Sequence, residues 1–250
     1  MQPTWRRPSG ASRRFAAPAA VLVAALALLP WPARAADSLL VNASAGPAAA
    51  FARYTAGRRQ STPWNLETIQ IEACLPKLAK AGRFRAIRRL LPFGQPQYQV
   101  LELAGDQTVK QEVIVRYLSA EARAAEIPAA SVAVTPANYK FRYKGVVAGP
   151  HGSAYVFLIT PRKKRQGLIK GELWLDSETG AAVRQSGFLV KRPSIFVRRI
   201  DVTRETSFSG GVAESRITHV SVDLRLVGRA ELTIEERPLP TTSRAVLPAR

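Results

Sequence analysis

The stretch from Tyr139 to Glu236 decides the fold through five segments: 139–144 YKFRYK, 154–160 AYVFLIT, 169–176 IKGELWLD, 182–190 AVRQSGFLV and 219–226 HVSVDLRL. Apolar and polar residues alternate in most of them, which is typical of β-strands with one buried face. The run Asp176-Ser177-Glu178-Thr179-Gly180 separates two of the segments with residues that favour a turn. The stretch therefore predicts an antiparallel meander.

The same alternation predicts strands elsewhere in the chain, at 66–73, 84–91, 98–104, 194–207 and 230–234. We expect a turn at Lys80-Ala81-Gly82 before the second of these strands. We also expect Trp174 and Phe188 to pack together on facing strands.

Between Thr108 and Ala125 the apolar residues are spaced three and four positions apart, which indicates a helix. Asp106 precedes the helix as an N-cap, and Ile127-Pro128 ends it. This is the one helix of any length that could cover the sheet. A long sheet with so little cover leaves apolar surface, which either closes as a barrel or holds an apolar ligand. The predicted fold class is mainly β (α+β).

The first 35 residues predict a cleaved signal peptide. Four arginines up to Arg14 precede an apolar run from Phe15 to Leu29, and Ala33-Arg34-Ala35 matches a cleavage site. We expect a flexible arm or short helix at 36–63, a single domain at 64–237 and a disordered tail at 238–250. Export to the periplasm follows from the signal.

The chain is strongly basic, with a formal charge of +19. Removing residues 1–35 takes away five arginines and no acid, so the charge falls to +14 over the remaining 215 residues. This charge favours anionic partners such as lipid phosphates. Export argues against nucleic acid as a partner, and so does the scattering of the basic residues along the chain. The single cysteine, Cys74, excludes an internal disulfide.

No catalytic pattern stands out, and we predict no enzyme, metal or cofactor. The two histidines, His151 and His219, lack a second ligand at metal spacing. We interpret Glu235-Glu236, and Glu172 with Asp176, as surface charge rather than an acid and base pair. The basic run Lys163, Lys164 and Arg165 is either a solvated hairpin tip or a contact for anionic headgroups and membranes.

The run Lys170 to Gly180 (KGELWLDSETG), followed by Val183-Arg184, resembles a hairpin of the bacterial outer-membrane lipoprotein-sorting superfamily, which includes LolA-like, LolB-like and RseB-like proteins. The resemblance covers about Phe51 to Glu235. It implies a curved antiparallel sheet that forms an unclosed half-barrel, with one or two covering helices and a cavity for acyl chains. It also implies an arginine that pins the lid, which the sequence does not assign to a residue.

These observations give two hypotheses. In the first, the protein is a monomer that binds a lipid or an acylated protein, works with an inner- or outer-membrane complex, and traffics lipid or lipoprotein. In the second, it is an envelope sensor or interaction module that binds a membrane-protein segment at a free sheet edge. The predicted cavity lining is Phe141, Tyr143, Phe157, Leu173, Leu175, Ile200, Val222, Leu224, Leu232 and Ile234.

Overall fold

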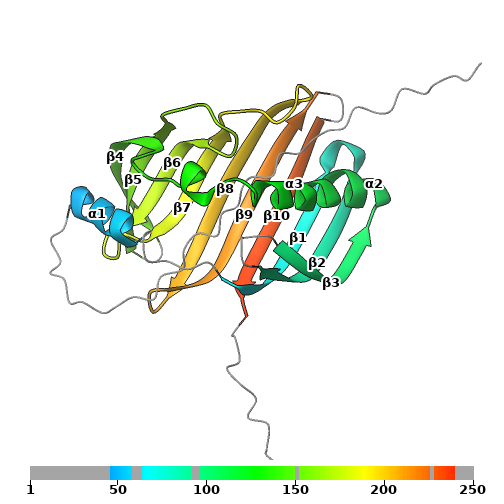
Figure 1. The fold of residues 1–250 in the computed structure, drawn as a ribbon, viewed down its shortest axis with the longest axis horizontal. Helices are drawn as coiled ribbons and strands as arrows, with labels where there is room; N and C mark the ends of the chain where they lie inside the picture. Colours follow the sequence, from blue (N-terminus) through cyan, green and yellow to red (C-terminus); the bar gives the residue numbers. More distant parts are fainter. Residues whose placement is uncertain (1–45, 58–63, 92–95, 150–151, 226–227, 240–250) are drawn as a thin grey trace, which may run out of the picture.

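The protein is built on one antiparallel sheet of ten strands (Figure 1). The computed structural model describes residues 46–57, 64–91, 96–149, 152–225 and 228–239. The strands are β1 Leu66–Leu75, β2 Lys80–Leu90, β3 Pro96–Gly105, β4 Tyr139–Gly149, β5 Gly152–Pro161, β6 Ile169–Asp176, β7 Ala182–Leu189, β8 Val197–Ser209, β9 Val212–Leu224 and β10 Gly228–Pro238. The helices are α1 Pro47–Gly57, η1 Pro76–Leu78, α2 Gln107–Val109, η2 Lys110–Val115, α3 Arg116–Ala124 and α4 Ala129–Val132.

The strand order is β3-β2-β1-β10-β9-β8-β7-β6-β5-β4, so β10 joins β1 in the middle of the sheet. β3 and β4 form the two edges and do not pair with each other. The predicted mainly β class and the unclosed antiparallel sheet are therefore confirmed. The predicted signal peptide (1–35) lies outside the described residues, as do 36–45, 58–63 and the tail from residue 240.

α2, η2 and α3 form one continuous helical segment, called the lid helix below, which spans Gln107–Ala124. This confirms the predicted helix. The Asp106 carboxylate accepts hydrogen bonds from the backbone N–H groups of Thr108 and Val109, as an N-cap does. The central turns, Lys110–Val115, are π-helical, a geometry that is rare and occurs frequently at functional sites.

The lid helix lies across one face of β1, β2, β9 and β10 (Figure 1), and we call this the inner face. Val109, Val113, Ile114 and Tyr117 of the helix pack there against the apolar side chains of the strands. A second core cluster joins α1 and the segment around Val132 to β4, β5 and β6. Each cluster removes apolar surface from water and so holds its helix on the sheet.

The turn Asp176–Gly180 forms as predicted. The Asp176 carboxylate accepts hydrogen bonds from the backbone N–H groups of Glu178 and Thr179, and Gly180 has a φ of +70°. Gly171 of the same motif lies directly opposite Gly187, and a Cβ at Gly171 would stand 2.0 Å from the Ser186 carbonyl oxygen. The glycine in the motif therefore allows close approach of β6 and β7.

Two local expectations are wrong. Lys80, Ala81 and Gly82 lie within β2, and the turn is made by η1 with Ala79 in the left-handed region. Trp174 faces Arg184 across β6 and β7, whereas Phe188 faces Lys170. An arginine covers each of these rings instead: Arg184 lies 5.0 Å from the Trp174 centroid and Arg199 lies 4.5 Å from the Phe188 centroid.

A hydrogen bond from α1 gives a first testable prediction. The Tyr54 hydroxyl donates to the Val134 carbonyl oxygen at 2.7 Å in a buried position. Tyr54→Phe should lower the free energy of unfolding by about 1–2 kcal/mol, because it leaves that carbonyl unsatisfied. Urea unfolding measures the change. The control is Thr55→Ala, whose exposed hydroxyl bonds only within the helix, and it should leave the midpoint nearly unchanged.

Candidate functional site

The predicted cavity residues lie on the inner face, but they divide between the two core clusters. Ile200, Val222, Leu232 and Ile234 belong to the cluster under the lid helix, and Leu224 packs against it. Phe157, Leu173 and Leu175 belong to the cluster under α1, and Phe141 packs against that one. Leu173, Leu175, Val222 and Ile234 are 0% exposed, so no water-sized space adjoins these four side chains in this conformation.

Near the β4 edge the inner face is partly open. A ladder of aromatic side chains begins at Phe51 of α1, whose ring centroid lies 4.8 Å from that of Phe141 and 5.4 Å from that of Phe157. Tyr143 continues the ladder at 5.7 Å from Phe157, and its residue is 45% exposed. Three predicted residues, Phe141, Tyr143 and Phe157, are thus brought together with an aromatic from the arm that was not predicted.

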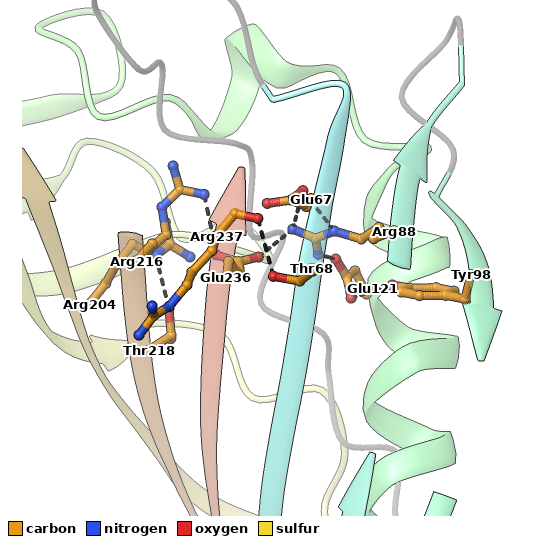
Figure 2. Close-up of polar contacts among 10 residues, drawn as sticks. All are labelled: Glu67, Thr68, Arg88, Tyr98, Glu121, Arg204, Arg216, Thr218, Glu236 and Arg237. Carbon is orange, nitrogen blue, oxygen red and sulfur yellow. Dashed lines mark hydrogen bonds and ion pairs between the residues drawn. The ribbon is translucent and has the colours of Figure 1, made fainter. Parts of the chain in front are cut away.

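A buried charged cluster occupies one end of the inner face (Figure 2). Arg88 of β2, Glu67 of β1, Glu236 of β10 and Glu121 of α3 meet there, and all are at most 7% exposed. Arg88 forms ion pairs with the three glutamates. Its contact with Glu67 runs through Nε at 2.9 Å and Nη2 at 2.8 Å. One guanidinium therefore serves three carboxylates from three different elements.

The cluster extends along the sheet. Arg216 of β9 pairs with Glu236 at 3.3 Å, and its guanidinium carbon lies 4.7 Å from the centroid of the Trp64 ring. Arg204 of β8 bonds the hydroxyl of Thr218, as Figure 2 shows. Burial lowers the pKa of Arg204 to about 10, with the Arg216 charge acting in the same direction. The described cluster thus contains three arginines and three glutamates.

Glu121 connects this cluster to the lid helix. It sits in the last turns of α3, where it accepts a hydrogen bond from the Tyr98 hydroxyl of β3 at 2.7 Å in addition to the ion pair with Arg88. The neighbouring Tyr117 is also buried, and its hydroxyl has no hydrogen-bond partner among the described residues. The polar contacts of Glu121 therefore fasten the C-terminal part of the lid helix to β2 and β3.

The carboxylates have different protonation behaviour. Burial raises the pKa of Glu67 to about 7; Arg88 opposes the rise and Glu236 adds to it. Burial would also raise the pKa of Glu236, but Arg88 and Arg216 outweigh it and the pKa falls below its ordinary value. The negative charge of Glu67 is less well stabilised than that of Glu236, since Glu67 Oε2 has no hydrogen-bond partner among the described residues. It therefore keeps its proton to higher pH.

The interpretation of Glu235-Glu236 as surface charge is wrong for Glu236, which is 0% exposed. Glu235 points to the other face and pairs with Arg237. The cluster could have been found from spacing, because its glutamates lie at the same period as the apolar residues of the buried face. Glu67 precedes Ile69 and Ile71 by steps of two, Glu236 follows Ile234 in the same way, and Glu121 lies four residues after Tyr117 on the apolar side of the helix.

The predicted basic run is far from this cluster in the fold. Lys163, Lys164 and Arg165 lie in the connection between β5 and β6 and are exposed. The described helices include none long and apolar enough to cross a bilayer. A depression of about 260 Å³ lies along β8, β9 and β10, where its lining includes Asp201, Thr203 and His219 together with Val202 and Val220.

The fold and site define an unclosed antiparallel sheet whose apolar inner face is covered by a separately fastened helix. No family model and no curated protein sequence matches the chain. Solved structures do match. A LolA superfamily protein from Nitrosomonas europaea has 10% identity and a TM-score of 0.36, and the match covers 78% of this chain and 94% of that one.

Two further structures also match. A DUF1329 family protein from Desulfovibrio piger has 9% identity and a TM-score of 0.38, with 76% of this chain and 90% of that one covered. MucB has 13% identity and a TM-score of 0.26, with 78% and 94% covered, and it has also been solved in complex with MucA(peri). These matches include the superfamily that the hairpin resembles.

Proposed function

We propose that this chain is an exported periplasmic protein, without enzymatic activity, that binds a lipid or lipoprotein acyl chain on the inner face of the sheet and takes part in envelope lipid or lipoprotein trafficking. The observation that carries the proposal is the lid helix. The lid helix packs over the apolar inner face of the sheet, and the buried ion pair between Arg88 and Glu121 holds the helix on the sheet.

In the described conformation most of the predicted lining is packed rather than open, and Tyr143 is its exposed member. Binding therefore requires the lid helix or α1 to move away from the sheet and an acyl chain to take its place. The exchange replaces one apolar contact by another, so its hydrophobic cost is small compared with exposing the same surface to water. The turns Lys110–Val115 are π-helical, so their hydrogen bonding differs from that of the rest of the lid helix. We expect the lid helix to bend at these turns when it moves away from the sheet.

The aromatic ladder offers the entry point. Tyr143 and Phe141 are exposed or half-buried at the β4 edge, while the inner residues Leu173 and Leu175 are covered. An acyl chain that first contacts Tyr143 can follow the ladder past Phe157 to the core cluster under α1. Arg88 would act as the arginine that pins the lid, because its guanidinium is the shared partner of the helix carboxylate and two strand carboxylates.

Tyr143→Glu tests the entry point. Because it puts a charge beside the acyl chain, it should weaken the binding of a dansyl-labelled fatty acid by roughly tenfold, with little change in unfolding. The matched control is Val147→Glu on the same strand. Val147 is 38% exposed, and the register turns it to the outer face, opposite Ala154. Equal binding by wild type and Tyr143→Glu would exclude this route.

The alternative function is the addition of a partner strand at a free edge, and two observations weigh against it. The pairing of β2 with β3 shifts at Leu101, and that of β4 with β5 shifts at Lys144, so both edge strands carry a bulge. β3 also starts with Pro96. Bulges and prolines at edges hinder pairing with another strand. The exposed Val100 and Leu103 on β3 keep this function as the second candidate.

A further inference from the structure

Two connections at the same end of the sheet are rich in cations and contain no acid. Residues 161–170 run from the end of β5 to the start of β6, and residues 191–200 run from the β7–β8 connection into the start of β8. Neither stretch contains an aspartate or glutamate. Together they carry nine cations: Arg162, Lys163, Lys164, Arg165, Lys170, Lys191, Arg192, Arg198 and Arg199. By contrast, the turn at the opposite end of β6 and β7 carries the acids Asp176 and Glu178.

The two connections lie side by side at the upper end of the sheet in Figure 1. The backbone N–H of Val190 donates to the Leu168 carbonyl oxygen at 3.0 Å, and Ile169 faces Leu189 across β6 and β7. Arg225, at the end of β9, donates its backbone N–H to the Phe196 carbonyl oxygen at 3.0 Å. The packing thus gathers cations from three separate parts of the chain, and we call this surface the basic end.

Most of these cations are free to meet an external anion. Lys163, Lys164, Arg165, Lys191, Arg192 and Arg198 are exposed, and none of the ion pairs among the described residues includes them. The nearby acids are already used, since Asp201 pairs with Arg199 and Asp223 pairs with Arg229. The basic end therefore presents a positive potential that the protein itself does not neutralise.

An apolar side chain projects from the same surface. Ile195 is 76% exposed, more than any other large hydrophobic residue described. Its position is fixed by a tight turn, in which Phe196 donates its backbone N–H to the Ser194 hydroxyl and Val197 donates its backbone N–H to the Ser194 carbonyl oxygen, both at 3.2 Å. Val197 is fully buried behind it. The turn therefore holds Ile195 outward among cations.

We propose that the basic end docks on the surface of an anionic phospholipid bilayer, with Ile195 entering the headgroup region. Cations that surround a protruding apolar side chain match the two attractions that such a surface offers, to phosphate and to acyl chain. An acidic polymer would use the cations and leave Ile195 in water, so the bilayer fits more of the surface. This docking does not require acyl binding on the inner face.

Vesicle flotation tests the docking with protein purified from its own envelope. Wild type should bind vesicles of phosphatidylglycerol and phosphatidylcholine, and should not bind pure phosphatidylcholine. Lys163→Glu/Lys164→Glu should weaken that binding by roughly 30-fold or more, and Ile195→Asp by roughly tenfold. Salt should release wild type, because the Debye length falls from about 10 Å at 0.1 M to about 3 Å at 1 M.

The matched control is Arg89→Glu/Arg142→Glu, which changes the net charge equally at exposed positions outside the basic end and outside the lid helix. It should bind nearly as wild type does. An equal loss in the control would overturn the proposal in favour of net charge alone. Undiminished binding by Ile195→Asp, together with competition by soluble polyphosphate, would overturn it in favour of an acidic polymer. Retained dansyl fatty acid binding in all variants shows that the inner face is intact and separates the two proposals.

Discussion

We expect Arg88→Met to lower the free energy of unfolding by about 3–5 kcal/mol, because it leaves three buried carboxylates without their shared cation. For a chain of this size the melting temperature should fall by roughly 6–20 °C. Arg88 is 2% exposed and contacts Glu67, Glu121 and Glu236, so water cannot compensate for its loss. Thermal and urea unfolding at neutral pH measure the effect.

The neighbouring residue provides the control. Arg89 is exposed on the same strand, and Arg89→Met should leave stability almost unchanged. Arg88→Met should also speed amide exchange in α3, since Glu121 then lacks its ion pair with β2. The destabilisation should shrink in acid, where the carboxylates take up protons. A variant as stable as wild type at neutral pH would show that the buried cluster contributes no net stability.

The second large effect is a dependence of stability on pH that originates in Glu67. Its pKa is raised from an ordinary value of 4.5 to about 7 in the folded protein. The folded state therefore binds more protons than the unfolded state between these values, and the free energy of unfolding falls as the pH rises through this window. This contribution is fully present below about pH 4.5 and is lost above about pH 7, with a size of about 3 kcal/mol.

Glu67→Gln should remove that slope, because the amide keeps the shape of the protonated acid but does not titrate. Urea unfolding at about pH 5 and about pH 8 should show a smaller change in the variant than in wild type. Glu235→Gln serves as the control, since its carboxylate is on the outer face and paired with Arg237. An identical pH dependence in wild type and Glu67→Gln would place the proton on another group of the cluster.

Local sequence patterns predicted the strands and the lid helix because both depend on short-range periodicity. Asp106 and the turn at Gly180 were predictable for the same reason, since each acts within a few residues. The place of β10 beside β1 was not predictable in this way. It joins residues about 160 positions apart, such as Ile71 and Ile234, and depends on the whole sheet.

The candidate site was only partly predictable. Alternation placed Leu173 and Val222 on the inner face, but it could not tell an open cavity from a packed core. The charged cluster was missed because the side chain of a glutamate or arginine on a strand is usually exposed to solvent. Its members become buried only when five strands and the lid helix bring opposite charges together. Ile195 in the β7–β8 connection likewise gave no periodic signal.

The proposed function requires the inner face to bind an acyl chain beneath the lid helix or α1 when one of them moves away. Native mass spectrometry with lipid extraction, on protein purified from its own envelope, tests it most directly. We predict a stoichiometric phospholipid or acylated peptide on wild type and much less on Tyr143→Glu. A mass without bound lipid after gentle purification, and no lipid in the extract, would contradict the claim and favour a protein segment as the partner.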